Sequence, residues 1–217
     1  MQIFRPAANT VARVVLIAIV VGPFLLIGLA YAVMRSSYIT GQNVALHQPI
    51  PFSHKHHVGD DGIDCRYCHT SVEKSAFAGL PPTTTCMTCH SQLFTNAAML
   101  APVRNSLAEH KPIHWQRVHR LPDYVYFDHS VHIAKGIGCT TCHGPVGTMP
   151  LMRQAAPLTM GWCLDCHRNP APNLRPPSQI FSLNWAPPKD QLEQSKKLLV
   201  QYHIQTEHLT DCSRCHR

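Results

Sequence analysis

Five copies of one short motif, Cys-x-x-Cys-His, constrain this chain more than any other feature. All ten cysteines of the 217-residue sequence lie in these copies, so none is left over. The spacing places two thiols and an imidazole on one short turn, and it is the attachment signature of c-type haem. The copies are Cys65, Cys68 and His69; Cys86, Cys89 and His90; Cys139, Cys142 and His143; Cys163, Cys166 and His167; and Cys212, Cys215 and His216.

Two other uses of paired cysteines are less consistent with this pattern. Disulfides are common in oxidising compartments, and structural zinc sites combine cysteine pairs with spaced histidines. Neither explains why a histidine follows the second cysteine in every copy. The sequence therefore predicts five covalently attached haem c groups, each with the motif histidine as the proximal ligand of its iron.

The composition predicts a thin side-chain core. The chain has 16 histidines and 18 prolines, and its apolar residues are concentrated near the N-terminus. Flat, apolar haem groups would fill the interior instead. We expect a mostly irregular and α-helical fold, with one N-terminal transmembrane helix, a haem-packed multihaem cytochrome c domain and few strands.

The segment Val14–Met34 is 21 residues long and carries no charge. At 1.5 Å per residue it spans a hydrocarbon core of about 30 Å. Arg5 and Arg13 precede it and only Arg35 follows closely, which favours a cytoplasmic N-terminus. A cleaved signal peptide is the alternative, because Ala-Tyr-Ala at 30–32 resembles a cleavage site, but the run is long for one. We predict a single-pass anchor in the inner (plasma) membrane, with the haem domain periplasmic.

The rest of the chain contains an internal repeat. PFSHKHHVGDDGIDCRYCH aligns with YFDHSVHIAKGIGCTTCH, and a second haem motif follows each copy. Such repetition guides the prediction of fold before local propensities do. The predicted organisation is a cytoplasmic tail over residues 1–12, a transmembrane anchor over 13–35 and a pentahaem cytochrome c domain over 36–217. Within that domain, repeat one covers 51–100, repeat two 126–170 and the closing motif 190–217.

Regular secondary structure is otherwise sparse. We predict one helix from about Asp190 to Thr210, after Pro187-Pro188, and short helices around each haem motif. Proline-rich stretches such as 80–82 and 169–177 indicate extended or turn segments.

Each repeat opens with Phe-x-His-x-x-His, and these histidines are the best candidates for distal iron ligands. Low-spin electron-transfer haems need a sixth ligand, usually His or Met. His56 has no counterpart in repeat two, where Val131 stands, so we predict no specific role for it. The four candidates are His54, His57, His129 and His132.

This opening resembles that of the class III multihaem cytochromes c. The resemblance implies that His54 binds the iron at Cys65/Cys68 and that His129 binds the iron at Cys139/Cys142. It also implies that His57 and His132 each reach a different haem, a neighbouring one.

Methionine is an alternative distal ligand that would raise the reduction potential relative to histidine. Met160 precedes Cys163 by three residues, and Met149 is nearby; the position in repeat one that matches Met160 is Thr83. If one haem is His/Met-ligated, Met149 or Met160 replaces one of the assigned histidines. Packing against a haem face is the simpler use of either side chain.

Two longer strings, WQRVHRLPDYVYFDHSVH and PLTMGWCLDCHRNP, together with one anchor and five motifs, resemble the membrane-anchored pentahaem subunits of bacterial alternative complex III. The resemblance covers most of residues 10–217. It implies partner subunits of a membrane quinol-oxidising complex, including an iron–sulfur protein, and a periplasmic acceptor that is a cytochrome c or a copper protein. The first string also makes His119 the choice for the fifth distal ligand.

We therefore predict a wire that carries electrons from quinol oxidation to a periplasmic acceptor and has no catalytic residue of its own. The alternatives are a self-contained membrane-anchored quinol dehydrogenase and a multihaem reductase of a small molecule, which would need one iron with an open position. Beyond its partner proteins, the chain should contact membrane lipid. The formal net charge of +7 does not imply nucleic acid, because haem propionates would offset much of it.

Overall fold

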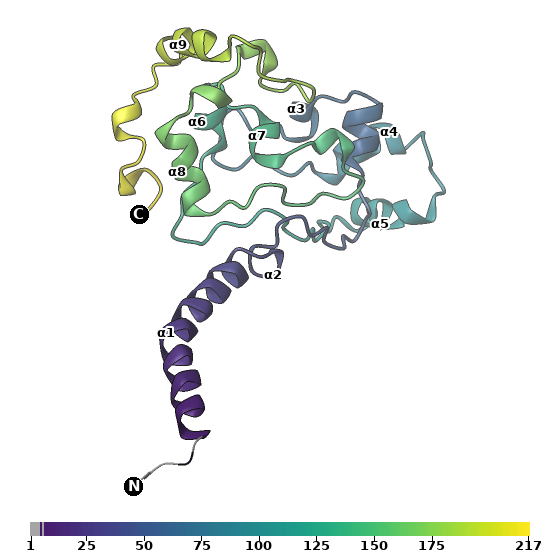
Figure 1. The fold of residues 1–217 in the computed structure, drawn as a ribbon. Helices are drawn as coiled ribbons and strands as arrows, with labels where there is room; N and C mark the ends of the chain where they lie inside the picture. The colour runs from purple at the N-terminus through teal and green to yellow at the C-terminus, as the bar shows by residue number, and fades with distance from the viewer. Residues whose placement is uncertain (1–4, 6) are drawn as a thin grey trace. The chain divides into compact units, whose positions relative to one another are not determined.

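The computed structural model describes residue 5 and residues 7–217. The chain divides into two compact units, residues 1–42 and residues 43–217, and each is described by itself (Figure 1).

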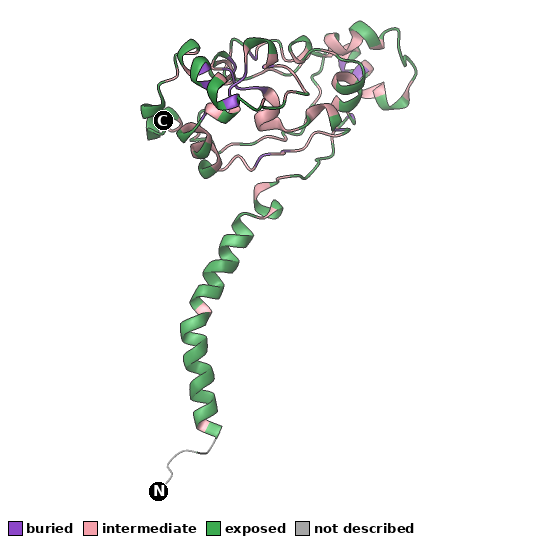
Figure 2. Ribbon diagram, turned by 45° about the horizontal axis from the view of Figure 1, so that its top comes forward, coloured by how far each residue is buried: buried purple, intermediate pink, exposed green. Residues whose placement is uncertain are grey.

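The first unit is one long apolar helix followed by a short one. Helix α1 covers Ala7–Met34 and helix α2 covers Ser37–Thr40, which ends at Gly41 in the left-handed conformation (φ +67°). The 28 residues of α1 correspond to about 42 Å of helix, and its most apolar window has a mean hydropathy of 2.7. Figure 2 shows it exposed along almost all of its length. By length and composition this helix fits a single-pass membrane anchor, as predicted; it begins seven residues before the apolar run does.

The second unit consists of short helical segments joined by irregular chain. Its first half contains a π-helix η1 (Lys55–Asp60), α3 (Cys65–Cys68), α4 (Thr83–His90), η2 (Ala98–Leu100) and α5 (Ala101–Glu109). Its second half contains α6 (His129–Ala134), α7 (Cys139–His143), η3 (Val146–Thr148), α8 (Met160–Arg168), η4 (Ala171–Asn173), η5 (Pro177–Gln179), α9 (Gln191–Gln201), η6 (Thr206–His208) and η7 (Cys212–Arg214).

Strand structure is limited to isolated bridges in the described part of the chain. They join Ala45 to Arg153, Val125 to His216 and Ile137 to Leu174. The predicted fold class, helical and irregular with few strands, is confirmed.

The side-chain core is thin, as the composition predicted. One small cluster joins Val72, Ile133 and Ile180, and a second joins Ile137, Leu174 and Leu198. Ten apolar side chains are buried among the described residues, and Figure 2 shows most of this unit as intermediate or exposed. So little buried apolar surface leaves room for an additional apolar component of the fold.

The two repeats fold alike at their Phe-x-His-x-x-His openings. Phe52 stacks on His57 at 4.5 Å between ring centroids, and Phe127 stacks on His132 at 4.4 Å. Each opening is also capped at the same position. The Ser53 hydroxyl accepts the backbone N–H of His56, and an Asp128 carboxylate oxygen accepts those of Ser130 and Val131.

A one-residue difference between the repeats explains their different helix types. His57 precedes Cys65 by eight positions, whereas His132 precedes Cys139 by seven. The extra residue in repeat one widens the turn into the π-helix η1, while α6 is a regular α-helix. Single insertions are commonly accommodated in this way at functional sites.

The helix predicted over 190–210 is wrong in its second half, because α9 ends at Gln201. The carbonyl oxygen of Tyr202 accepts a hydrogen bond from Lys135 Nζ at 2.7 Å, so a side chain from α6's C-terminal cap takes the place of a helical N–H. His203 then adopts a left-handed conformation (φ +50°), which a continuing helix does not allow. This tertiary contact is not visible in the local sequence pattern.

Candidate haem-binding sites

Each of the five cysteine motifs lies on its own helical turn: α3, α4, α7, α8 and η7. Residues three and four apart share a face of such a turn, so both thiols and the histidine point the same way. None of the ten cysteines is in a disulfide. Among the described residues, no group of three or more His, Cys, Asp or Glu gathers as a site for a bare metal ion.

Four of the five motif histidines hydrogen-bond a backbone carbonyl through Nδ1. A carbonyl oxygen only accepts, so Nδ1 must carry the hydrogen and Nε2 keeps the lone pair that a metal needs. Such outer contacts also fix the orientation of a ligating ring. The acceptors are Gly79 for His69 (2.7 Å), Leu93 for His90 (3.2 Å), Leu209 for His167 (2.8 Å) and Tyr124 for His216 (3.2 Å).

The candidate distal histidines repeat this arrangement. Nδ1 of His57 donates to the carbonyl of Ser53 at 2.9 Å, and Nδ1 of His132 donates to the carbonyl of Asp128 at 2.7 Å. His129 donates in the same way to Ala76, a residue of repeat one, at 2.8 Å. Each of the three rings therefore offers Nε2 as an acceptor.

Three of these rings face a motif histidine at nearly the same distance. The centroids of His57 and His90 are 6.1 Å apart, those of His132 and His167 are 6.2 Å apart, and those of His129 and His143 are 6.3 Å apart. Two metal–nitrogen bonds of about 2.0 Å, with half a ring at either end, span roughly 6 Å. The spacing fits one iron between each pair.

His54, which the family resemblance assigns to the iron at Cys65/Cys68, lies near His69. Burial, followed by the nearby imidazole of His69, lowers the pKa of His54 to about 4. His54 is therefore neutral at pH 7, the form in which an imidazole binds a metal. Its buried Nδ1 has no hydrogen-bond partner.

His119, the predicted fifth distal ligand, contacts His143 instead of facing a motif histidine across a gap. Its Nε2 lies 3.2 Å from Nδ1 of His143, and the two rings meet edge to face at 4.3 Å between centroids. Burial lowers the pKa of His119 to about 4 and that of His143 to about 3, so both rings are neutral at pH 7.

The two candidate methionines differ in exposure. Met149 is fully buried, and its methyl group lies near Gly144, directly after His143. Met160 opens helix α8 with 62% of its surface exposed. His56, for which no role was predicted, points to the surface and contacts Asp61 at 3.5 Å. These placements leave Met160 the more accessible of the two candidate sulfur ligands.

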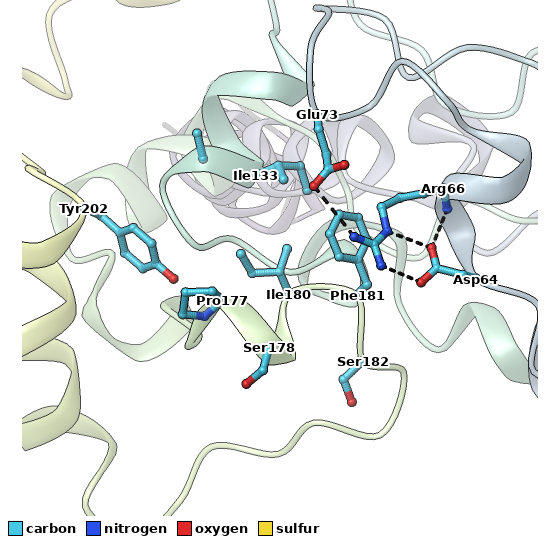
Figure 3. A pocket seen from close by; sticks show the side chains of 11 residues that line it. Asp64, Arg66, Glu73, Ile133, Pro177, Ser178, Ile180, Phe181, Ser182 and Tyr202 are labelled. Carbon is cyan, nitrogen blue, oxygen red and sulfur yellow. Dashed lines mark hydrogen bonds and ion pairs between the residues drawn. The ribbon is translucent and has the colours of Figure 1, made fainter.

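A cavity of about 660 Å³ lies beside the first motif, between α3, α6 and the segment 177–182 (Figure 3). Arg66 crosses it, paired with Asp64 at 2.8 Å and with Glu73 at 3.9 Å, over the face of Phe181 at 4.3 Å. No cysteine or histidine is among the residues that line it, so it is separate from the paired imidazoles.

Comparison with known proteins identifies the family. Residues 125–217 match the family model described as "Cytochrome c7 and related cytochrome c". A curated relative, "Menaquinone reductase, multiheme cytochrome c subunit" of Nitratidesulfovibrio vulgaris, is 31% identical over 170 residues, which cover 78% of this chain and 67% of the relative. Ten cysteines outside disulfides, and imidazoles with available Nε2 atoms, fit covalently attached haem c. The chain is therefore a multihaem c-type cytochrome, of the family that includes this menaquinone reductase subunit.

Proposed function

We propose that the chain carries five covalently attached haem c groups, one on each Cys-x-x-Cys-His motif, and passes electrons between a quinone-reactive partner at the membrane and an acceptor on the periplasmic side. The observation that carries this proposal is the pairing of imidazoles at 6.1–6.3 Å between centroids in both repeats. When bound, haem supplies a one-electron Fe(III)/Fe(II) couple.

The proposed axial pairs are His54 with His69, His57 with His90, His129 with His143, and His132 with His167. Each Phe-x-His-x-x-His turn would then hold two irons, one at the motif that directly follows and one at the next motif. A single rigid turn would thus fix two redox centres relative to each other in each repeat.

The work of the polypeptide in this proposal is orientation and exclusion of water. Phe52 and Phe127 stack on His57 and His132, and the Nδ1 hydrogen bonds set the ring planes. Burial lowers the pKa of His132, which favours the neutral form of that imidazole. Fixed ligands in a low-dielectric site support fast electron transfer because little around them has to rearrange.

For the closing motif we propose Met160 as the sixth ligand in preference to His119 or Met149. An imidazole that accepts a hydrogen bond at Nε2 cannot bind iron through the same lone pair, and Nε2 of His119 lies against His143. Met160 is exposed one helical turn before Cys163, and Cys215 of the closing motif is close enough to raise the pKa of the Cys163 thiol, after burial.

The wider context that we propose is a quinol-oxidising membrane complex of the alternative complex III type. Its partners would include an iron–sulfur subunit, and its acceptor would be a periplasmic cytochrome c or copper protein. The apolar helix α1 supports attachment to the membrane. The orientation that we propose has the N-terminus cytoplasmic and the haem domain periplasmic. A second candidate is electron flow in the opposite direction, toward menaquinone, which the name of the menaquinone reductase relative favours.

Two measurements test this proposal. Intact-mass analysis of the purified full chain should give five haem additions. A smaller number would contradict the proposal that all five motifs carry a haem. In stopped-flow mixing of the membrane complex with a short-chain quinol, the haems should become reduced. The rate of this reduction should exceed the rate at which the reduced haems are oxidised by a quinone. If the reduced complex delivers electrons to quinone faster, the reverse direction is the correct one.

A further inference from the structure

Arg175 is the one charged side chain that is buried among the described residues, with 2% of its surface exposed. Burial lowers its pKa, but the group remains protonated at neutral pH because an arginine starts above 12. A buried cation ordinarily pairs with an acid. Here no Asp or Glu among the described residues forms an ion pair with it.

Its partners are neutral, and two of them belong to the third haem motif. The guanidinium donates to the hydroxyl of Thr140 at 2.7 Å and to that of Thr141 at 3.2 Å. It also donates to the carbonyl of Ser182 at 3.2 Å and lies over the ring of Trp185 at 4.4 Å. Its buried Nε has no partner.

The surrounding backbone holds this position firmly. The N–H of Arg175 donates to the carbonyl of Gly136 at 2.9 Å, and its own carbonyl accepts from the hydroxyl of Tyr202 at 2.7 Å. A β-carbon at Gly138, directly before Cys139, would lie 2.2 Å from the guanidinium carbon. The glycine therefore leaves the space that the cation occupies.

We propose that Arg175 is a positioning residue that fixes a positive charge, with no Asp or Glu partner among the described residues, against the Cys139–His143 turn and raises the reduction potential of the haem attached there. The inference rests on the proposed attachment of haem to this motif. When that iron accepts one electron from a neighbouring haem or a chemical reductant, the charge of the site falls by one. A nearby buried cation stabilises the reduced state, and the low dielectric strengthens the effect.

The test compares Arg175→Met and Arg175→Gln, which remove the charge, with Arg175→Lys, which keeps it. Met is close to Arg in length and removes the cost of burying a charge, so the Met variant is expected to fold even if the Gln variant does not. All three lose the guanidinium fork, and only two lose the charge.

Spectroscopic redox titration of each purified full chain should separate these effects. In the Met and Gln variants, one haem component should show a reduced-to-oxidised ratio at least tenfold lower at a fixed potential, about 59 mV for a one-electron couple. The Lys variant should titrate like the unsubstituted chain. Unchanged components in every variant, or an equal fall in the Lys variant, would overturn the inference.

The haem content of each variant distinguishes a failure of the proposed function from a failure of the Arg175 inference. If the unsubstituted chain carries no haem on Cys139 and Cys142 by peptide mass analysis, the proposed function fails at this motif. If it carries that haem and the Arg175 variants lose it, the residue acts in haem attachment or folding, and the electrostatic role is overturned while the proposed function stands.

Discussion

The imidazole rings of His57 and His90 lie with their centroids 6.1 Å apart and their planes at 71°, although they come from different parts of repeat one. The ring centroids of His132 and His167 lie at nearly the same distance in repeat two, 6.2 Å, with their planes at 31°. The second histidine of each Phe-x-His-x-x-His opening thus reaches the second motif of its own repeat. This relationship links neighbouring redox centres in the proposed account.

Replacing His57 by Ala should leave the His90 iron with one protein ligand. We expect one haem to change from low-spin to high-spin and to bind cyanide, as measured by electron paramagnetic resonance and by optical titration. His56→Ala is the matched control, because His56 is adjacent and exposed and faces Asp61. A His57 variant in which every haem stays low-spin would remove this residue from the ligand set.

The sequence alone predicted much of this arrangement, for identifiable reasons. The motif histidines follow from a fixed spacing, and the distal candidates follow from the repeat that aligns His57 with His132. For His57 and His132 the sequence predicted only that each reaches a neighbouring haem. It could not say which one, because that depends on how α4 and α8 pack. The end of α9 was missed because it depends on Lys135, distant in the chain.

Some features had weak sequence signals that could have been used. The extra residue between His57 and Cys65 indicates a widened turn, which appears as the π-helix η1. Arg175 had no local signal at all. Its burial beside Thr140 and Thr141 is a property of the folded chain.

Asp128 caps the helix that carries His129 and His132, so its carboxylate should stabilise repeat two. Asp128→Ala should lower the free energy of unfolding by about 1 kcal/mol, whereas Asp128→Asn should cost less because asparagine caps nearly as well. Denaturant unfolding followed by circular dichroism measures the difference. Equal losses in the two variants would argue against capping.

The same cap predicts a pH dependence. Hydrogen bonds, first from Ser130, lower the pKa of Asp128 below its ordinary value of 3.8. The stabilisation by the charged cap is therefore present above that value and is lost as the pH falls through the lower pKa of the folded state. The stability difference between the unsubstituted chain and Asp128→Asn should accordingly shrink on acidification below about pH 4. A difference that grows on acidification would contradict the assignment.

Gly62 and Gly136 occupy matched positions in the two repeats and both have positive φ, +71° and +78°. Gly62→Ala should cost about 1–2 kcal/mol from backbone strain alone, since its β-carbon would meet nothing within 4 Å. Gly136→Ala should cost roughly 1–3 kcal/mol more, because its β-carbon would lie 2.3 Å from the ring of Tyr202. The melting temperature should fall further in Gly136→Ala than in Gly62→Ala. A larger fall in Gly62→Ala would contradict this packing.

Substitutions at Met160 and at His119 should affect the haem of the closing motif differently. Met160→Leu should turn one haem high-spin and remove the spectroscopic signature of a thioether ligand. His119→Asn should leave the number of low-spin haems unchanged, because its Nε2 contacts His143. A high-spin haem in the His119 variant, with none in the Met160 variant, would return the role of distal ligand to His119.

The measurement that tests the central claim most directly is electron paramagnetic resonance of the oxidised, purified full chain, combined with its haem count. The account predicts five haems per chain, all low-spin, with no new signal after addition of cyanide or nitrite. A high-spin haem that binds either anion would contradict it, since an open iron position indicates a reductase of small molecules instead of an electron wire.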